Sequence, residues 1–316
     1  MTLAIEVTDV SKSFGETRAV RQLNLEIPMG SMCGFLGPNG AGKSTTIRMI
    51  MSIIHADKGK IQVLGTTALA AKDRIGYLPE ERGVYRKMKV CKFIEYIAKL
   101  KGMKGPSLRK KIDAWLQRIE LPDVHNKKCE ELSKGMQQKV QFLTAIIHDP
   151  ELIILDEPFS GLDPVNAKVI GGVIHDLHNE GRTILFSTHV LHQAEQICNR
   201  IVMIDQGIKV LDGSLESIQE QFNPRVVQVE PVDSSVQFDS IQGVSHTTRI
   251  DGTSRVDLRI DETANPIEVL QKIVAFTPVI SAQLAKPSLD EIFIDQVASS
   301  RGLEAADAAR LGLDHA

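Results

Sequence analysis

Residues 37–44 read Gly37-Pro38-Asn39-Gly40-Ala41-Gly42-Lys43-Ser44, and this stretch decides the fold of the 316-residue chain. It matches GxxxxGK[ST] in full and stands between a strand-like apolar segment at 32–36 and a helix predicted from Lys43 to about Ile54. Its glycines allow backbone N–H groups to converge on phosphate oxygens, and the helix N-terminus adds positive potential. We therefore expect a phosphate-binding loop made of Gly37, Pro38, Asn39, Gly40, Ala41, Gly42, Lys43, Ser44 and Thr45.

Two positions of the loop and one acidic pair predict nucleotide chemistry. We expect Lys43 to reach the β- and γ-phosphates and the Ser44 hydroxyl to bind Mg²⁺. Asp156 and Glu157 directly follow the apolar run 152–155. Asp156 is then placed to hold the magnesium shell, and Glu157 to polarise the attacking water. An acidic pair after a strand also fits the start of a surface loop, but the neighbouring strand–helix alternation favours the catalytic interpretation.

His189 ends a third polar motif, Ser187-Thr188-His189, after the apolar strand predicted at 183–187. In a parallel sheet this residue would lie at the same edge as Asp156 and the phosphate loop, where ligands bind in such folds. It would then contact the γ-phosphate. A lone histidine is more often structural, and position alone leaves both interpretations open.

The pattern of elements predicts an α/β fold with a parallel core. Residues 89–149 have helical periodicity, and Gln206-Gly207 marks a hairpin. After residue 150 apolar strands alternate with helices. The predicted strands span 3–10, 19–27, 32–36, 61–64, 74–78, 152–155, 183–187 and 201–204, and the later helices span 164–180 and 190–199.

A second, smaller domain is predicted beyond residue 221, where the composition turns acidic and Asn223-Pro224 suggests a linker. We assign 1–221 to the first domain, 222–298 to a small α+β domain, and 299–316 to a flexible tail. Ser288 with Glu291 three residues later predicts a helix start. The other elements are strands at 225–229, 244–250, 255–260 and 279–284 and a helix at 267–275.

Composition excludes several classes of protein. The formal net charge is −3 and 24% of residues are charged, without the concentrated basic surface of a nucleic-acid binder, so we expect no nucleic-acid partner. The four cysteines are widely spaced, which predicts reduced, buried thiols. The sequence shows neither a signal-peptide pattern nor an apolar run of ~20 residues. We therefore expect a soluble chain whose membrane role, if it has one, depends on a partner.

Further motifs make roughly residues 3–220 similar to the ATP-binding cassette (ABC) ATPase family. Leu132-Ser133-Lys134-Gly135-Met136-Gln137 resembles the family signature LSGGQ, and Ser160-Gly161-Leu162-Asp163 resembles its D-loop. The resemblance implies a P-loop NTPase cassette: a RecA-like parallel core, an antiparallel β subdomain and a helical subdomain at about 89–149. It also implies ATP and Mg²⁺ as ligands and a homodimer. There Ser133 and Gly135 would face the γ-phosphate bound by the other copy, and Asp163 would link the two sites.

The chain departs from the family pattern at several positions. Lys134 and Met136 replace the usual glycine and glutamine, and Lys134 either adds charge near the γ-phosphate or points to solvent. Glu80 stands where the Q-loop glutamine is usual and could still bind Mg²⁺ or orient water. Phe14 replaces the commoner adenine-stacking tyrosine, and its ring keeps the stacking surface.

The segments YLPEERG (77–83) and LSKGMQQK (132–139) resemble the ATPases of ABC-2-type exporters linked to sodium or drug efflux. Residues 286–293 resemble the end of the small C-terminal domain of that branch. The resemblance implies an ATP-hydrolysing subunit at the cytoplasmic face of the inner or plasma membrane. It would drive transport by a separate ABC-2-type permease, which the helical segment would contact.

Two alternative functions remain. A soluble, non-transport ABC ATPase could act on a macromolecular complex, but repair and chromosome types carry a long coiled coil before the signature, and this sequence has no sustained heptads there. Translation types usually carry two cassettes in one chain, and this chain has one. A binding switch with little turnover is disfavoured by the presence of Glu157 and His189.

Overall fold

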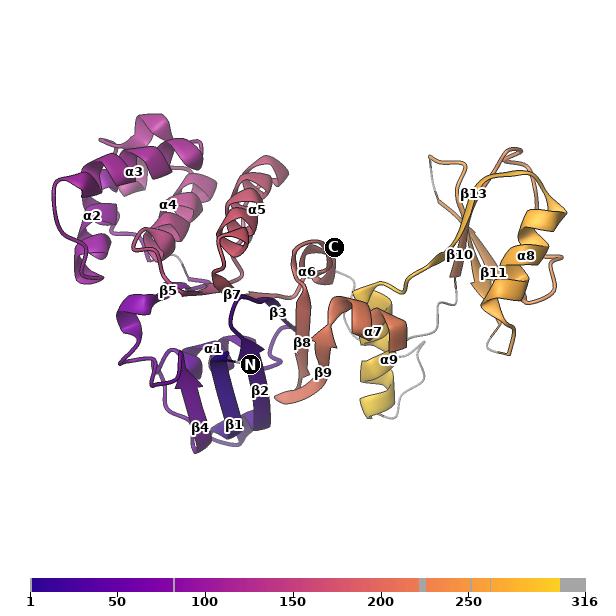
Figure 1. Ribbon diagram of the computed structural model, residues 1–316, viewed down its shortest axis with the longest axis horizontal. Coiled ribbons are helices and arrows are strands. Elements are labelled where there is room, and N and C mark those ends of the chain that lie inside the picture. The colour runs from indigo at the N-terminus through magenta and orange to yellow at the C-terminus, as the bar shows by residue number, and fades with distance from the viewer. Residues whose placement is uncertain (1, 82, 222–225, 251, 262, 302–316) are drawn as a thin grey trace. The chain divides into compact units, whose positions relative to one another are not determined.

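The computed structural model describes residues 2–81, 83–221, 226–250, 252–261 and 263–301, shown in Figure 1. The chain forms two compact units, which meet in the sequence between Leu215 and Glu216. We call residues up to Leu215 the first unit and residues from Glu216 the second unit. Helix α7 (Leu215–Gln221) thus belongs largely to the second unit, whereas the boundary predicted from the sequence lies at 221.

The first unit is built on a six-stranded sheet with the order β5-β6-β7-β3-β8-β9. All neighbouring pairs are parallel except β8 and β9, which form the hairpin predicted at Gln206-Gly207. Strands β3, β6 and β7 are buried along their whole length, as expected of apolar runs covered on both faces. The strands are β3 (Met32–Leu36), β5 (Ile75–Leu78), β6 (Leu152–Asp156), β7 (Thr183–Thr188), β8 (Arg200–Asp205) and β9 (Ile208–Ser214).

Three helices connect the parallel strands: α1 (Lys43–Ile50), α5 (Pro164–Asn179) and α6 (Leu191–Ile197). The predicted extension of the first of these to Ile54 is wrong. Ser52 adopts a left-handed φ of 56°, and the Ile53 and Ile54 amides both donate to the Arg48 carbonyl, which closes the helix. No glycine marks this end, so the sequence carried no stop signal.

A three-stranded antiparallel sheet, β2-β1-β4, packs with α1 and the central sheet into one apolar core. Its strands are β1 (Leu3–Phe14), β2 (Thr17–Pro28) and β4 (Lys58–Val63). The strands at 3–10, 19–27 and 61–64 are confirmed; the first two extend further than predicted, while the third begins three residues earlier, at Lys58, and ends one residue earlier, at Val63. The β1–β2 turn pairs Phe14 with Thr17.

The helical region predicted at 89–149 consists mainly of α2 (Val90–Leu100), α3 (Ser107–Arg118) and α4 (Lys134–Ile146). These helices gather at one end of the first unit (Figure 1). Ser133 caps α4, because its hydroxyl accepts a hydrogen bond from the Met136 amide at 3.2 Å. No helix in the described ranges is both long and apolar enough to cross a membrane, and all four cysteines are buried free thiols, as predicted.

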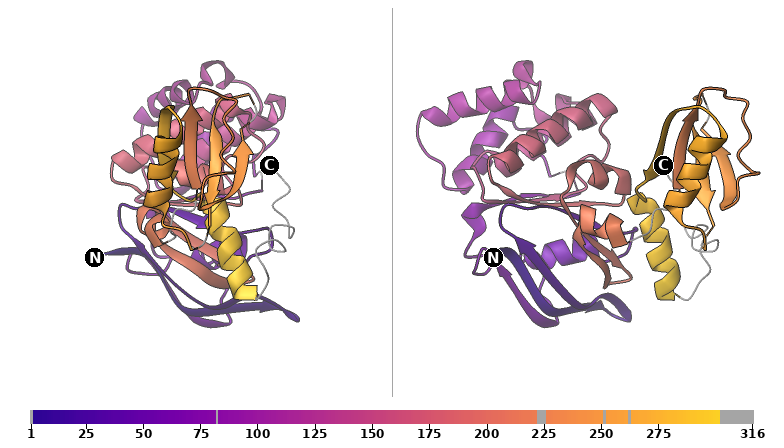
Figure 2. Two further views of the ribbon diagram at one scale, coloured as in Figure 1. Left: turned by 90° about the vertical axis from the view of Figure 1, so that its right-hand side faces the viewer. Right: turned by 45° about the vertical axis from the view of Figure 1, so that its right-hand side comes forward.

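The second unit contains a four-stranded antiparallel sheet with the order β11-β12-β10-β13, and α8 packs against β13 and β10 (Figure 2). The predicted α+β class is confirmed. Ser288 and Glu291 form the predicted cap of α9. The Asn223-Pro224 linker and the tail from 302 lie outside the described residues, while 299–301 continue α9. The elements are α7 (Leu215–Gln221), β10 (Val226–Pro231), β11 (Val244–Arg249), β12 (Val256–Ile260), α8 (Pro266–Phe276), β13 (Val279–Ala285) and α9 (Leu289–Arg301).

Candidate functional site

The glycine-rich loop joins β3 to α1 and borders a cavity of about 530 Å³. Gly37 and Gly42 have φ angles of 149° and 104°. A Cβ atom at Gly37 would lie 2.2 Å from the Ile204 carbonyl oxygen, and one at Gly42 would lie 2.4 Å from that of Ala19. Side chains are therefore excluded at both positions. The loop backbone is free to face the cavity, as a phosphate-binding loop requires.

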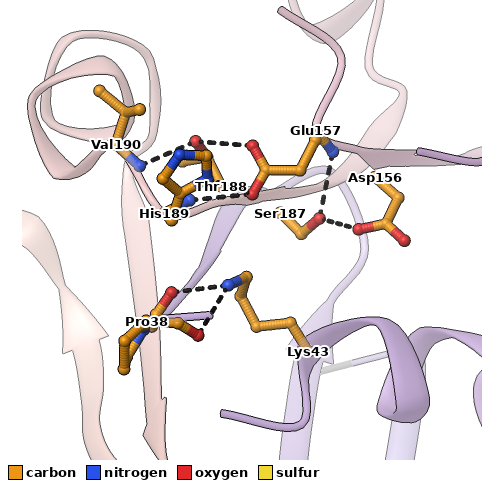
Figure 3. A network of polar contacts seen from close by, with 9 residues as sticks. Pro38, Lys43, Asp156, Glu157, Ser187, Thr188, His189 and Val190 are labelled. Atoms are coloured by element: carbon orange, nitrogen blue, oxygen red, sulfur yellow. Dashed lines mark hydrogen bonds and ion pairs between the residues drawn. The ribbon is translucent and has the colours of Figure 1, made fainter. Parts of the chain in front are cut away.

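Lys43 is buried beside the cavity, with 6% of its surface exposed. Its Nζ donates to the carbonyl oxygens of Gly37 at 2.6 Å and Pro38 at 3.1 Å (Figure 3). Burial lowers the pKa of the Lys43 ammonium, while the carboxylates of Glu157 and Asp156 oppose that shift. A buried cation whose hydrogen-bond partners among the described residues are neutral carbonyls is suited to bind an anionic ligand.

Asp156 ends β6 and is 1% exposed. Ser187 lies beside it in register on β7, and Ser187 Oγ donates to Asp156 Oδ1 at 2.5 Å. Burial raises the pKa of Asp156, and hydrogen bonds from Ser187 and Ser44 oppose that shift. The predicted pair of Ser44 and Asp156 is thus brought together. The structural role of Ser187 was not predicted, because it depends on strand register.

Glu157 and His189 contact each other directly (Figure 3). Glu157 Oε1 accepts hydrogen bonds from the His189 backbone amide at 3.0 Å and from His189 Nδ1 at 2.8 Å, with Nδ1 taken as the protonated nitrogen. Glu157 Oε2 accepts from Thr188 Oγ1 at 3.3 Å. The Glu157 backbone has a left-handed φ of 50°, which is uncommon for a non-glycine residue. Because of this backbone turn, the side chains of Glu157 and Asp156 point in different directions.

The cavity wall includes residues that sequence reasoning missed. The β8–β9 turn holds the loop in place, since the Gly207 amide donates to the Ala41 carbonyl at 2.9 Å and the Gly207 carbonyl accepts from the Arg21 amide at 2.8 Å. The Gln206-Gly207 signal predicted this turn but not its neighbours. The predicted residues Asn39–Thr45, Glu80 and Glu157 line the cavity together with the unpredicted Glu16, Thr17, Arg18, Ala19, Arg21 and Gln206.

Some predicted site residues are not among those that line the cavity, namely Phe14, Gly37, Pro38, Ser133, Gly135, Asp156 and His189. Phe14 is 51% exposed and lies under the Lys12 ammonium, although its β-partner Thr17 does line the cavity. Ser133 and Gly135 are at the start of α4, where a Cβ at Gly135 would lie 3.5 Å from Leu162. The signature and the D-loop-like segment are therefore neighbours within one chain.

The oxygen donors near the loop fit a magnesium ion that arrives with a nucleotide. Ser44, Asp156 and Glu80 supply a hydroxyl and two carboxylates, the hard ligands that Mg²⁺ prefers. The described residues contain no cluster of three or more His, Cys, Asp or Glu side chains with metal-binding geometry.

Comparisons with known proteins cover both units. The family model described as "ABC transporter" matches residues 20–160, and the model "ATP-binding protein DrrA1-3-like, C-terminal domain" matches residues 213–297. The chain is 39% identical to the uncharacterized ABC transporter ATP-binding protein YhaQ of Bacillus subtilis, over 93% of this chain and 98% of the relative. It is 27% identical to the linearmycin resistance ATP-binding protein LnrL of the same species, over 92% and 97%. It is 35% identical to the Nod factor export ATP-binding protein I of Sinorhizobium fredii, over 72% and 68%.

Solved structures agree with this likeness. A structure titled as the ATP binding subunit of an ABC transporter aligns with a TM-score of 0.65 at 29% identity, over 70% of this chain and 93% of that chain. A nucleotide-free ATP-binding cassette from an ABC transporter aligns with a TM-score of 0.61 at 22% identity, over 69% and 94%, which shows the shared fold.

Proposed function

Because the chain belongs to the family of ABC transporter ATP-binding proteins, we propose that it is the ATP-hydrolysing subunit of an exporter and works with a separate ABC-2-type membrane permease. The observation that carries the export proposal is the likeness to the Nod factor export ATP-binding protein I of Sinorhizobium fredii, whose name states export. The likeness to LnrL, whose name states linearmycin resistance, extends over both units and adds support. The proposed place of action is the cytoplasmic face of the membrane.

MgATP would bind in the cavity along the glycine-rich loop. Lys43 would exchange its hydrogen bonds to the Gly37 and Pro38 carbonyls for stronger, charge-assisted bonds to the β- and γ-phosphates. Ser44, Asp156 and Glu80 would hold the magnesium ion, which neutralises phosphate charge when bound. The adenine would stack on Phe14, whose β-partner Thr17 lines the cavity.

Hydrolysis requires a base for the attacking water, and Glu157 is the best-placed carboxylate. His189 and Thr188 donate to its oxygens and fix its orientation. The His189 side chain is 45% exposed, so its ring has a free edge for the γ-phosphate while Nδ1 stays on Glu157. In this assignment Glu157 takes the proton from water and His189 senses the γ-phosphate.

A second copy of the chain would complete each site. Ser133 and Gly135 begin a thirteen-residue helix whose first turn has no acidic residue, so its positive end is available to an anion. Neither residue lines the cavity of its own chain. Two cassettes packed head to tail would bring each signature to the other copy's ATP, and Asp163, which caps α5, would link the two sites.

The proposal is tested by mild solubilisation of native membranes and identification of the proteins that co-purify with the tagged full chain. Recovery of a polytopic permease with about six apolar spans supports it, since each span needs ~20 residues. Recovery of ribosomes or DNA, or of the chain alone, contradicts the transport assignment but leaves the ATPase assignment intact.

A further inference from the structure

Two glutamine side chains on α4 are almost completely buried. Gln138 is 2% exposed and Gln141 is 4% exposed, and they lie one helical turn apart. Gln138 Nε2 donates to the carbonyl oxygen of Pro158 at 3.2 Å, directly after Glu157. Burying an amide group costs free energy unless the group is hydrogen bonded. Buried amide side chains therefore nearly always have hydrogen-bond partners.

Gln141 makes two hydrogen bonds to one loop. Its Nε2 donates to the Glu81 carbonyl at 3.0 Å, and its Oε1 accepts from the Gly83 amide at 3.3 Å. These residues lie one and three positions after Glu80, which lines the cavity. The helix that begins at the signature is therefore joined through one side chain to the loop that carries Glu80.

Contacts other than those of Gln141 hold the later part of this loop, where the Glu130 amide donates to the Arg86 carbonyl and the Cys129 amide donates to the Met88 carbonyl, each at 2.9 Å. None of the described residues between Leu78 and Val90 belongs to a helix or strand, and in the same set the backbone groups of Glu81 and Gly83 make no hydrogen bond except those with Gln141. The Glu81 carboxylate pairs with Arg48 at 3.5 Å, but the Glu81 side chain is 87% exposed. Exposed pairs of this kind contribute little. Among the residues that the structure describes, the two hydrogen bonds of Gln141 are therefore the main restraint on the first part of the loop, which follows Glu80.

We propose that Gln141 is a positioning residue that holds the Glu80 loop against α4, so that helix and loop move as one body and Glu80 stays at the nucleotide. The inference rests on the proposed role of Glu80 beside MgATP. Ser133 and Gln141 are eight residues apart, which corresponds to about 12 Å along the helix. A displacement of the signature end is then transmitted to Glu80 over that distance.

The first test is the Gln141→Leu variant of the full chain, which keeps a similar side-chain volume and removes both hydrogen bonds. Because misplacing a catalytic group slows the reaction more than it weakens binding, we expect kcat to fall about tenfold and KM for MgATP to change less than about threefold. Lys139→Met is the matched control. Lys139 is also buried on α4 and donates to the Ile119 carbonyl at 3.0 Å, away from the cavity. Its kcat should stay within about twofold of the parent.

A double-mutant comparison identifies the group through which Gln141 acts. If it works by placing Glu80, the variant Glu80→Ala/Gln141→Leu should be no slower than Glu80→Ala. Multiplication of the two single losses would overturn the inference. A parental rate for Glu80→Ala would remove the proposed role of Glu80 itself, whereas a slow Glu80→Ala beside a parental Gln141→Leu would overturn only the inference.

Amide hydrogen exchange gives a readout that does not depend on catalysis. The Gly83 amide should exchange at least about tenfold faster in Gln141→Leu than in the parent, and at the parental rate in Lys139→Met. Unchanged exchange at Gly83 in Gln141→Leu would show that this side chain does not restrain the loop, and the inference would fail.

Discussion

The two units of the chain differ in what they bury. The first unit encloses the ionisable side chains of Lys43, Lys139, Asp156, Glu157 and Asp205, each at most 9% exposed. In the second unit, Thr277 is the only buried polar or charged residue among those the structure describes. Its core is apolar, with Val227, Phe238 and Leu258 fully buried.

This difference indicates that the first unit carries the reactive groups and that the second unit is held together by apolar packing. Burying a charge costs free energy, which other interactions of the fold must offset. Buried charges are therefore found mainly where they bind a ligand or take part in a reaction. Beside the glycine-rich loop, burial lowers the pKa of Lys43 and raises that of Asp156. Neighbouring groups of opposite charge with perturbed pKa values indicate a functional site. In the described part of the second unit burial raises the pKa of Asp257, but Asp257 is not among the residues that line the cavity at the glycine-rich loop.

The largest expected effect on stability belongs to the apolar core of the second unit. Phe238→Ala should destabilise that unit by about 4 kcal/mol, because a large buried side chain leaves a cavity. Hydrogen exchange of β10 and β12 measures the loss. Trp115, the single tryptophan, lies in α3 and reports the first unit, whose unfolding and ATPase rate should be unchanged.

Phe276→Ala is the control for this prediction, since Phe276 belongs to the same unit and is 53% exposed. We expect it to cost less than about 1 kcal/mol. A loss of ATP hydrolysis in Phe238→Ala, with the first unit still folded, would contradict the division of labour between the units.

The next effect concerns the buried cation of the first unit. Lys43→Met should weaken ATP binding about a hundredfold, because hydrogen bonds to charged groups contribute about 1.5–3 kcal/mol. Titration with ATP measures the affinity, and Lys139→Met, which removes another buried ammonium outside the cavity, should stay within about twofold. If the ATP affinity of Lys43→Met is within threefold of that of the parent, burial alone does not identify a lysine that binds the nucleotide.

The smallest expected effect is a pH dependence of the first unit. His148 donates through Nε2 to the Ile75 carbonyl at 3.1 Å, and burial lowers its pKa to about 4. As the pH falls, His148 takes up a proton in the unfolded chain before it does so in the folded chain. The stability that depends on neutral His148 is therefore fully present above pH 6.5 and is lost as the pH falls toward 4. Between pH 7.5 and 5 the loss from this group is up to about 2 kcal/mol.

His148→Gln keeps a hydrogen-bond donor and cannot titrate. Between pH 7.5 and 5 it should therefore lose less stability than the parent, by up to about 2 kcal/mol. Urea unfolding followed by Trp115 fluorescence measures it. His175→Gln changes an exposed histidine and should follow the parent. Equal pH dependence of the parent and His148→Gln would contradict the prediction.

The sequence predicted best those parts of the site that are contiguous in the chain. Gly37–Ser44 was identifiable because its chemistry and its backbone requirements fall within eight residues. Asp156 and Glu157 were identifiable because they follow an unmistakable buried strand. The parallel core followed from the same apolar runs, which require cover on both faces.

Contacts set by register and by distant segments could not be predicted. Arg18 and Gln206 reach the same cavity wall from positions almost 190 residues apart, and no local pattern encodes that meeting. The hydrogen bond from Ser187 to Asp156 depends on the pairing of β6 with β7. Gln141 lies in an ordinary helical pattern, and only its two loop contacts distinguish it. The contact of Phe14 with a base, and that of Ser133 with a partner's phosphate, remain predictions.

The most direct test of the central claim is phosphate release by the purified full chain and by its Glu157→Gln variant at saturating MgATP. If the buried Glu157 is the general base, kcat should fall about a thousandfold while ATP affinity stays within about threefold. Glu180→Gln, at the exposed end of α5, should match the parent. Hydrolysis by Glu157→Gln at the parental rate would contradict the assignment of the catalytic base.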